Sequence, residues 1–581
     1  MTVAAQRASP PRQDWRDIAN GVALPTPGMK YVDQPYVVKL KDGAWLCLVT
    51  LGASAEGQPG NHTAALVSRD MGKTWSAPVK VCGPYAVPLV VGSGRIYALT
   101  PQSQCFSDDG GRTWSKLLKP NYDPDVHKRV SKSAQGGYEG SLGWSVSLPL
   151  VTPDGAYVAF ARVGLGRSPR RTDVYFMRSA NVLSEADATK VEWQLLPGGE
   201  EGIRGPAWDK PEHRSEEPHL VRLSNGTLYV VFRTDQGHIG HSTSEDGGKT
   251  WAKAQALKFP DGRTIKHSLA CSSLWKCSNG KYLLWFHNHS GPREFSAKMG
   301  WPYADRNPAW ICGGVEKDGT IAWSQPEVLL YAQDLSYEKG RLSYPGFMED
   351  GGRYFIFETQ KKEARMHEIP AAIFEGAWKQ AEGKTVAVAE GFAFEHKGAA
   401  ASKPQFDPLP VPAPPAVSGL TIEMAFTLSD ASADQVLLDS RSRDEGAGCF
   451  VTTTRTDALR LTITDGKRRR RVLETDAGVI RSNQPHHVVF ILDGAADVMW
   501  ALLDGRVCDG GAQRQFGWAR LDTDYPGSDP RPPRRQGAVE GVTLGPGMRI
   551  APALKGAVSL LRLYGRALTT SEAIANHRAL R

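Results

Sequence analysis

Short runs of alternating apolar and polar residues recur along most of the chain, and turns rich in Asp, Asn and Gly separate them. A period of two is the pattern of a β-strand with one buried face. Clusters of such runs cover residues 146–162, 172–196, 268–287 and 352–358, and no long helical period appears before 569–581. The pattern predicts an all-β protein in which six strand clusters fill roughly residues 20–390.

One motif occurs three times in the first half of the chain. Residues 68–75, 107–114 and 244–251 read SRDMGKTW, SDDGGRTW and SEDGGKTW. Asp and Gly favour a tight turn, because Gly adopts positive φ and the Asp side chain bonds the turn amides. Thr and Trp then anchor the turn and begin the next strand. The motif predicts a β-hairpin, so we assign its Asp residues a structural role and not a catalytic one.

The last third of the chain follows a segment of different composition. Residues 398–416 are rich in Ala and Pro, which is typical of a semi-rigid linker. Alternating strands resume at 420–428, 436–439, 459–464, 487–492, 499–503 and 558–564. The sequence thus predicts an N-terminal extension over 1–19, a first β domain over 20–397, the linker, and a second β domain over 417–581.

The composition is that of a folded, soluble protein. A length of 581 residues calls for at least two domains, and 41% hydrophobic with 23% charged residues is ordinary. The longest apolar runs, such as 87–91, are too short to span a membrane. The net charge of +8 is dispersed except at 467–471, which we interpret as a solvated hairpin edge rather than an anionic-glycan or nucleic-acid patch. We therefore expect neither nucleic acid nor membrane as a partner.

The eight cysteines are scattered, with neither a Cys-x-x-Cys pair nor a zinc spacing. We accordingly predict no metal and no cofactor. Cys47 lies in an apolar run and is expected to be a buried thiol. Cys271 and Cys277 are close enough in sequence to form a disulfide, which the sequence leaves open.

The repeated motif resembles the Asp-box of sialidases and related propellers, which implies a six-bladed β-propeller over 20–397. The second domain resembles laminin-G and concanavalin-A-like domains, above all at 556–569 (GAVSLLRLYGRALT). That resemblance implies a lectin-like β-sandwich of jelly-roll type, which either binds glycan or only packs on its neighbour. Asp-boxes mark an architecture and not a chemistry, so the function must be argued from other residues.

One stretch of the first domain resembles sialidases residue by residue. Glu217 begins a strand, an Asn-Gly turn follows, a second strand ends in Arg233, and the third copy of the motif comes next. The resemblance implies that Glu217 assists the nucleophile and that Arg233 is the second of three Arg residues holding the substrate carboxylate. Arg306 is placed like the third Arg, Tyr344 like the nucleophile, and Glu358 like a late Glu that supports the first Arg.

This residue set has a chemical reason. The anomeric carbon of sialic acid carries a carboxylate, which repels an anionic nucleophile. A neutral phenol activated by an adjacent carboxylate avoids that repulsion. Arg suits the substrate carboxylate because its planar guanidinium donates two parallel hydrogen bonds.

Two positions depart from the family. Sialidases carry their first Arg two residues before a Pro, and here Asp33 stands two residues before Pro35. The Arg triad is complete only if another Arg takes this place; the candidates are Arg204, Arg293 and Arg341. Asp33 itself is suited to bind a hydroxyl or to act as an acid or base.

The general acid is the second departure. Sialidases place an Asp on the loop before the first repeat, whereas residues 56–63 read EGQPGNHT. Glu56 and His62 are the ionisable candidates. His62 is attractive because an unperturbed imidazole changes charge near neutral pH, although a structural, hydrogen-bonded His is the alternative. His267 and His287 lie near strand ends and are candidates to line the pocket.

Three functions fit these observations, and we rank them in order. The first is an exo-acting glycoside hydrolase of sialidase type, which releases a terminal acidic sugar; Tyr344 attacks, Glu217 activates it, and His62 or Asp33 protonates the leaving group. The second is a polysaccharide lyase or glycosidase acting on uronic-acid polymers, which the missing Arg and the His-rich loops favour. The third is a non-catalytic glycan-binding protein.

Each function implies a glycan or polysaccharide partner, and the oligomeric state stays open. The first 14 residues are polar and contain no apolar signal core. Either the protein is cytoplasmic or the sequence lacks its signal. On functional grounds we favour a secreted or periplasmic location.

Overall fold

A computed structural model describes residues 14–122, 143–163, 172–198, 201–205, 214–291, 306–334, 340–380, 391–398, 406–414, 417–441, 446–467, 469–522 and 537–581. The chain divides into two compact units, Gly21–Glu382 and Met1–Asn20 with Gly383–Arg581. The boundary expected at residue 397 was placed too late, because β26 (Phe392–Lys397) pairs with β39 (Gly556–Tyr564) of the C-terminal unit. Arg16, from the predicted N-terminal extension, also belongs to that unit through an ion pair with Asp493.

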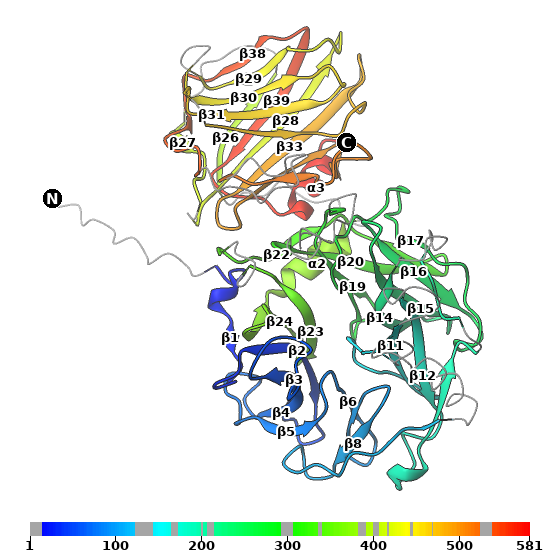
Figure 1. Ribbon diagram of the computed structural model, residues 1–581. Coiled ribbons are helices and arrows are strands. Elements are labelled where there is room, and N and C mark those ends of the chain that lie inside the picture. Colours follow the sequence, from blue (N-terminus) through cyan, green and yellow to red (C-terminus); the bar gives the residue numbers. More distant parts are fainter. Residues whose placement is uncertain are drawn as a thin grey trace, which may run out of the picture. The chain divides into compact units, whose positions relative to one another are not determined.

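The unit Gly21–Glu382 is built from strands, and six sheets follow one another along its described part (Figure 1). They are β2–β5 (Tyr31–Lys39, Trp45–Gly52, His62–Ser68, Val79–Cys82), β6–β8 (Val87–Val90, Ile96–Leu99, Gln104–Ser107), β9–β13 (Asn121–Tyr122, Leu150–Thr152, Gly155–Val163, Thr172–Ser179, Glu192–Leu196), β14–β17 (Ser215–Arg222, Leu228–Thr234, Ile239–Ser244, Gln255–Ala256), β18–β22 (Ser273–Lys276, Tyr282–Phe286, Ala309–Lys317, Thr320–Trp323, Glu327–Leu330), and β23–β25 (Ser343–Asp350, Arg353–Thr359, Ala364–Ile369) with β1 (Val22–Ala23). Neighbouring strands are antiparallel except β9 and β13. The all-β prediction is confirmed.

Successive sheets of this unit pack on one another. Hydrophobic clusters join β3 to β7, β7 to β11 and β12, and β12 to β15, and β14 lies against β18. Trp275 of β18 stacks on Phe347 of β23, with ring centroids 5.3 Å apart. Trp45 of β3 meets Phe355 of β24 edge-on at 4.9 Å. Each sheet therefore contacts the next, and the last contacts the first. β1 also adds the start of the unit to its final sheet.

The three repeated motifs form turns with the same hydrogen bonds. In the first turn Ser68 Oγ donates to Asp70 Oδ1 (2.9 Å), and Thr74 donates to Asp70 from its backbone N–H (2.9 Å) and its hydroxyl (2.6 Å). Asp109 and Asp246 accept equivalent bonds in the other two turns. These Asp side chains are occupied in holding the turns, in keeping with the structural role expected for them.

The C-terminal unit contains two larger sheets that share one hydrophobic core. The first sheet holds β26, β39, β28 (Gly419–Leu428), β33 (Pro485–Asp493), β34 (Val498–Leu503), β35 (Arg506–Val507) and β36 (Trp518–Ala519); the second holds β32 (Arg470–Glu474), β31 (Leu459–Thr464), β30 (Gly448–Thr453), β29 (Val436–Asp439) and β38 (Arg549–Ala553). β27 (Leu409–Pro410) pairs with β37 (Thr543–Leu544). Helix α3 (Thr570–Ala579) begins with a capping box formed by Thr569 and Glu572. The basic run at 467–471 enters the edge strand β32, but Arg471 turns inward and donates to the Leu521 carbonyl (3.0 Å).

Helices are few among the residues that the structure describes. They are α2 (Ala371–Lys379), α3 and two short 3-10 turns, η1 (Ile18–Asn20) and η2 (Ala188–Lys190). Within the described ranges no helix has the length and apolarity needed to cross a bilayer. All eight cysteines lie in described segments as buried free thiols. Cys47 is buried as expected, whereas Cys271 and Cys277 do not form the disulfide that their spacing allowed.

Candidate functional site

Three sheets of the first unit carry the same irregularity in their first strand. β-Bulges interrupt β2, β14 and β23 near their starts. In each bulge a residue other than glycine has a left-handed backbone and precedes a proline: Gln34 (φ 56°), Glu217 (φ 55°) and Tyr344 (φ 42°). Such a conformation costs about 1–3 kcal/mol and persists where the surroundings enforce it, often at functional sites. Three segments far apart in sequence therefore share the same type of β-bulge, in which a left-handed residue before a proline changes the direction of a polar side chain.

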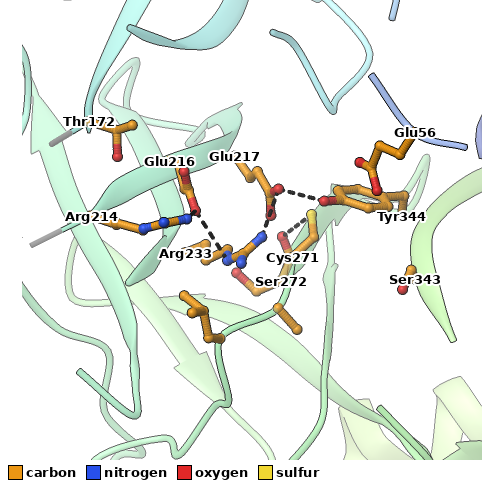
Figure 2. A network of polar contacts seen from close by, with 12 residues as sticks. Glu56, Thr172, Arg214, Glu216, Glu217, Arg233, Cys271, Ser272, Ser343 and Tyr344 are labelled. Carbon is orange, nitrogen blue, oxygen red and sulfur yellow. Dashed lines mark hydrogen bonds and ion pairs between the residues drawn. The ribbon is translucent and has the colours of Figure 1, made fainter. Parts of the chain in front are cut away.

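Glu217 lies at the centre of a buried polar network (Figure 2). Its Oε1 atom accepts a hydrogen bond from the Tyr344 hydroxyl (2.7 Å) and another from Arg233 Nη1 (2.8 Å). Arg233 also lies 3.4 Å from Glu216 Oε1, which in turn pairs with Arg214. The structure thus brings together Tyr344, Glu217 and Arg233, as the sequence predicted.

The electrostatics of the pair determine which of the two groups carries the proton in the resting site. Burial would raise the pKa of Glu217, but the Arg233 guanidinium, the Tyr344 hydroxyl and Arg306 outweigh it and hold that pKa below its usual value. Burial, reinforced by the Glu217 charge, raises the pKa of Tyr344 far above its usual value. In the resting site Glu217 is therefore a carboxylate and Tyr344 a neutral phenol.

Arg306 is buried beside this pair and differs from Arg233 in its partners. It donates to Ser343 Oγ (2.6 Å) and to the Leu269 carbonyl (3.4 Å), and its Nε atom has no partner. No carboxylate of the described residues pairs with it. A buried guanidinium without a counter-ion is suited to bind an anionic group of a substrate.

Position 33, where the family resemblance calls for an Arg, is occupied by a fully buried acid with a cation beside it. Asp33 Oδ2 accepts from Lys361 Nζ (2.5 Å) and from the Tyr31 hydroxyl (2.7 Å), and Oδ1 accepts from the Gln34 backbone (3.0 Å). Burial raises the pKa of Asp33 above its usual value, although Lys361 opposes the rise. Lys361 Nζ also donates to Glu56 Oε1 (3.0 Å) and lies 4.2 Å from the ring centroid of Tyr344, so Glu56 and Tyr344 share this neighbour.

The alternative arginines do not supply a third guanidinium beside Asp33 in the described structure. Arg204 forms an ion pair with Glu201 (2.7 Å). Arg341 is half-buried next to β23. Arg293 lies outside the described residues. The cation that accompanies position 33 is therefore Lys361, a residue that the sequence analysis did not select.

Glu358 and His62 lie apart from the hydrogen bonds around Tyr344. Glu358 is buried and bonds Gln360 and His367, whose Nε2 lies 3.3 Å from it. With no Arg at position 33, it has none to support. His62 is half-buried at the start of β4, with Nδ1 3.1 Å from the Gly60 carbonyl.

His267 and His287 stack on each other at 5.7 Å between ring centroids, and both are fully buried. His267 Nε2 lies 2.8 Å from the Ala270 carbonyl, and its Nδ1 accepts from the His287 backbone, so both nitrogens are occupied. Burial lowers the pKa of His267 to about 3 and that of His287 well below its usual value. Both imidazoles are therefore neutral. His287 Nε2 has no partner, so His287 is the better placed of the two to contact a ligand.

Several buried polar atoms of these sheets lack any hydrogen-bond partner. Most buried polar groups in proteins are paired, so each exception needs a reason. Among the described residues they include Gln34 Oε1, Glu217 Oε2, Ser268 Oγ, Ser272 Oγ, His287 Nε2 and Arg306 Nε. Unpaired donors and acceptors of this kind are able to bind a polar ligand such as a sugar. No group of three or more His, Cys, Asp or Glu side chains in the described ranges could hold a metal ion.

Sequence reasoning missed Glu216, Gln34 and Lys361. The Glu216-Glu217 doublet and the proline after Gln34, Glu217 and Tyr344 were visible signals. No signal marked Lys361, because nothing in the sequence predicts that a lysine adopts a left-handed backbone (φ 73°).

Comparison with known families supports part of this picture. A family model for a BNR repeat-like domain matches residues 179–356. This span contains Glu217, Arg233, Arg306 and Tyr344. No curated protein matches the chain significantly.

The similar solved structures are remote. A protein of unknown function from Dyadobacter fermentans is 15% identical, with a TM-score of 0.41 over 60% of this chain and 98% of that one. Trypanosoma rangeli sialidase, as a covalent intermediate with 2,3-difluorosialic acid, is 12% identical, with a TM-score of 0.39 over 97% of both chains. The Hadza microbial sialidase Hz136 is 17% identical, with a TM-score of 0.40 over 59% of this chain and 67% of that one. Likenesses this weak carry no argument about chemistry.

Proposed function

We propose that the protein is an exo-acting glycoside hydrolase of sialidase type, which releases a terminal acidic sugar, sialic acid or a relative, from glycans. The observation that carries the proposal is the hydrogen bond between the Tyr344 hydroxyl and Glu217, on an oxygen that Arg233 also binds. A phenol that shares a carboxylate oxygen with a buried guanidinium is the arrangement needed for a tyrosine nucleophile. The six sheets, each packed on the next, support a six-bladed propeller as the scaffold.

The reaction has two displacements. In the first, Tyr344 Oη bonds to the anomeric carbon, its proton passes to Glu217 Oε1, and the glycosidic C–O bond breaks as a general acid protonates the leaving oxygen. In the second, water attacks the anomeric carbon, the acid residue takes the water proton, and the bond from that carbon to Tyr344 Oη breaks as the phenol regains its proton from Glu217. The sugar is released with retained configuration. Arg306, which has no carboxylate partner in the described structure, holds the substrate carboxylate, and Arg233, already paired with Glu217 and Glu216, assists it.

Glu56 is the best candidate for the general acid. Its side chain is 54% exposed and lies beside Tyr344 (Figure 2). Asp33 is fully buried and both its oxygens are bonded inside the protein. His62 bonds a neighbouring carbonyl instead of the network around Tyr344. Geometry is the first requirement for a general acid, so we assign the role to Glu56 ahead of His62 and Asp33.

A fluorogenic aryl sialoside tests the proposal. The wild-type protein is expected to release the fluorophore, and Tyr344→Phe is expected to lose on the order of 10³-fold or more in kcat/KM, since removal of a nucleophile abolishes the covalent route. Phe keeps the ring and removes only the hydroxyl, so the thermal unfolding midpoint serves as the folding control. A wild-type protein that releases no fluorophore contradicts the proposal.

A lyase acting on uronic-acid polymers is the second candidate, and His287 favours it. A neutral imidazole with a free Nε2 atom is able to take a proton from a carbon next to a carboxylate. A lyase product is an unsaturated sugar that absorbs near 230 nm, so ultraviolet absorbance of digested polyuronates separates the two enzymes. The bond between Tyr344 and Glu217 weighs against a purely glycan-binding role.

The C-terminal unit and the location complete the proposal. Two sheets over one core support a lectin-like β-sandwich, which is suited to hold glycan near the catalytic unit. Glycan substrates of this kind lie outside the cell, so we propose a secreted or periplasmic protein.

A further inference from the structure

Lys361 is built into the first unit in a way that a surface lysine is not. It follows β24, only 8% of it is exposed, and its backbone is left-handed (φ 73°). Two hydrogen bonds hold this conformation: the Lys361 N–H donates to Thr359 Oγ1 (2.8 Å), and the Lys361 carbonyl accepts from the Val32 N–H (3.0 Å). Because a left-handed backbone is strained for lysine, the surrounding contacts must enforce it.

The strained backbone directs the ammonium into the cluster around the nucleophile. Lys361 Nζ lies 2.5 Å from Asp33 Oδ2 and 3.0 Å from Glu56 Oε1. It also lies 4.2 Å from the ring centroid of Tyr344 and 5.6 Å from that of Tyr31. One side chain thus contacts a fully buried acid, a half-exposed acid and the face of the proposed nucleophile.

These contacts point away from a role in anion binding. Asp33 already balances the single charge of Lys361, and Glu56 accepts a second hydrogen bond from it, whereas Arg306 has no carboxylate partner in the described structure. A substrate carboxylate gains more from Arg306 than from an ammonium that is already paired twice. The function of Lys361 is therefore to be sought in what it does to its partners.

The partner that depends most on Lys361 is Glu56. The described structure gives the Glu56 carboxylate no hydrogen bond other than the one to Lys361. Asp33 is held by Tyr31 and by the Gln34 backbone as well, so it anchors the ammonium from the buried side. The ammonium occupies only Oε1 of Glu56, which leaves Oε2 free to carry a proton.

We propose that Lys361 is a positioning residue, which, fixed by Asp33, holds Glu56 beside Tyr344 as the general acid. This inference rests on the proposed hydrolase function. The inference also explains the acid at position 33, where the family resemblance calls for an Arg. Asp33 fixes Lys361, and Lys361 in turn orients Glu56. Orientation matters because a general acid acts only within hydrogen-bond reach of the leaving oxygen.

Two substrates with different leaving groups test this role. A 4-methylumbelliferyl sialoside has an acidic leaving group that departs with little protonation, whereas methyl α-sialoside needs a full proton transfer. Lys361→Met removes the charge and keeps the stem. It is expected to lower kcat on the methyl sialoside by about 10²-fold, and on the aryl sialoside by less than about 5-fold, because general acid catalysis supplies 10²–10⁴. A merely structural lysine would affect both substrates alike.

Two further variants complete the test. Glu56→Gln should show the same split between substrates, and the Lys361→Met/Glu56→Gln double variant should be no slower than Glu56→Gln alone, because both changes remove one acid. Asp33→Asn keeps Lys361 and weakens the contact that fixes it. We therefore expect the loss of kcat on the methyl sialoside to exceed that on the aryl sialoside by only about 10-fold. This variant replaces Lys361→Met in the test if Lys361→Met does not fold.

The outcomes separate the two proposals. Wild-type protein that cleaves neither sialoside overturns the hydrolase function, and the role of Lys361 falls with it. Wild-type activity with equal losses on both substrates in Lys361→Met, or with effects of Lys361→Met and Glu56→Gln that multiply in the double variant, overturns the role of Lys361 alone. Binding of free N-acetylneuraminic acid, which has no leaving group, should stay within about 3-fold of wild type in Lys361→Met.

Discussion

Two buried glutamates, one in each unit, have almost the same neighbours. They differ in whether both carboxylate oxygens have hydrogen-bond partners. Glu217 contacts Arg233 and Tyr344 in the first unit, and Glu423 contacts Arg562 and Tyr564 in the C-terminal unit. Both carboxylates are almost completely buried. In both cases burial would raise the pKa, and the surrounding donors and cations hold it below its usual value.

The two sites differ in how the oxygens are used. Glu423 Oε1 lies 3.0 Å from His487 Nε2 and accepts from Arg562 (3.1 Å), and Oε2 accepts from Tyr564 (3.0 Å) and Asn576 (2.8 Å). All its lone pairs are engaged, and the network ties helix α3 to β28, β33 and β39. Glu217 receives both its bonds on Oε1, and Oε2 has no partner.

This difference separates a structural network from a functional one. A buried carboxylate whose oxygens are both paired, such as Glu423, fixes elements to one another and has no capacity left for a ligand. A buried oxygen that has no protein partner, such as Glu217 Oε2, is able to bind a ligand or water. The Glu–Arg–Tyr combination alone therefore does not identify a catalytic site; the unfilled hydrogen-bonding capacity around Glu217 does.

The same substitution at both glutamates should give opposite results, and this is the largest effect we expect. In Glu217→Gln the amide oxygen can keep both bonds and the NH₂ group takes the empty side, so stability should change by only about 1 kcal/mol. Loss of the base should lower kcat/KM on an aryl sialoside by about 10²–10⁴-fold. In Glu423→Gln the NH₂ group must face donors on either side. Stability should therefore fall by about 3–5 kcal/mol, with activity per folded molecule unchanged.

Urea unfolding and initial rates on folded protein measure both quantities. The comparison fails if Glu217→Gln loses as much stability as Glu423→Gln, since Glu217 would then be a structural residue. It also fails if the purified Glu217→Gln protein keeps wild-type activity.

The sequence predicted the parts of this molecule that depend on local patterns. Alternating strands predicted the all-β fold, and the three repeated motifs predicted turns held by Asp70, Asp109 and Asp246. Glu217 and Tyr344 lie 127 residues apart, yet the resemblance selected both and the structure joins them. Each residue occurs in a short motif, next to a proline, whose meaning does not depend on the rest of the chain.

The sequence did not predict contacts made by side chains from different sheets. Lys361 follows Glu358 by three positions, but a left-handed turn sends it to Asp33 and Glu56 while Glu358 turns to His367. A Gly or Asn in a sequence indicates that a positive φ is possible at that position, whereas a lysine gives no such indication.

The domain boundary and the surroundings of His62 also depend on contacts that no local pattern predicts. The alternating pattern over 392–397 predicts a strand, but it does not predict which domain the strand joins. The pairing with β39 assigns it to the C-terminal unit. His62 was attractive because of its intrinsic titration range. In the structure its Nδ1 lies 3.1 Å from the Gly60 carbonyl, whereas Glu56 bonds Lys361, whose Nζ lies 4.2 Å from the Tyr344 ring centroid.

Arg306 and Arg562, which lie in the same two networks as the glutamates, should show the same contrast, with a smaller effect on catalysis. Arg306 has no carboxylate partner in the described structure, whereas Arg562 pairs with Glu423 and Glu395. Arg306→Gln should raise KM for a sialoside by about 10- to 100-fold, because a hydrogen bond to a charged group contributes about 1.5–3 kcal/mol. Arg562→Gln, the matched control, should lower the unfolding midpoint and leave KM unchanged. An unchanged KM in Arg306→Gln would remove Arg306 from the substrate site.

The smallest effect concerns carboxylates that are fully paired but lie at the surface. Hydrogen bonds from the Thr250 hydroxyl and backbone lower the pKa of Asp246 to about 2. Since the folded pKa lies below the unfolded value of about 3.9, these bonds stabilise the protein above pH 4, and the contribution is lost as the pH falls toward 2. Asp246→Asn should therefore unfold at lower urea than wild type at pH 6, and the gap should narrow steadily toward pH 2.5.

Glu245, exposed and without a hydrogen bond in the described structure, provides the control for this measurement. Glu245→Gln should unfold at the wild-type urea concentration at both pH values. A gap for Asp246→Asn that keeps its size down to pH 2.5 would mean that the shape of the turn, and not the charge of its carboxylate, sets the stability. Asp246 would then differ from Glu423, whose network depends on charge. Solvent screens the electrostatic interactions of an exposed carboxylate. Even the charged form of Asp246 should therefore contribute far less to the free energy of unfolding than the buried network around Glu423.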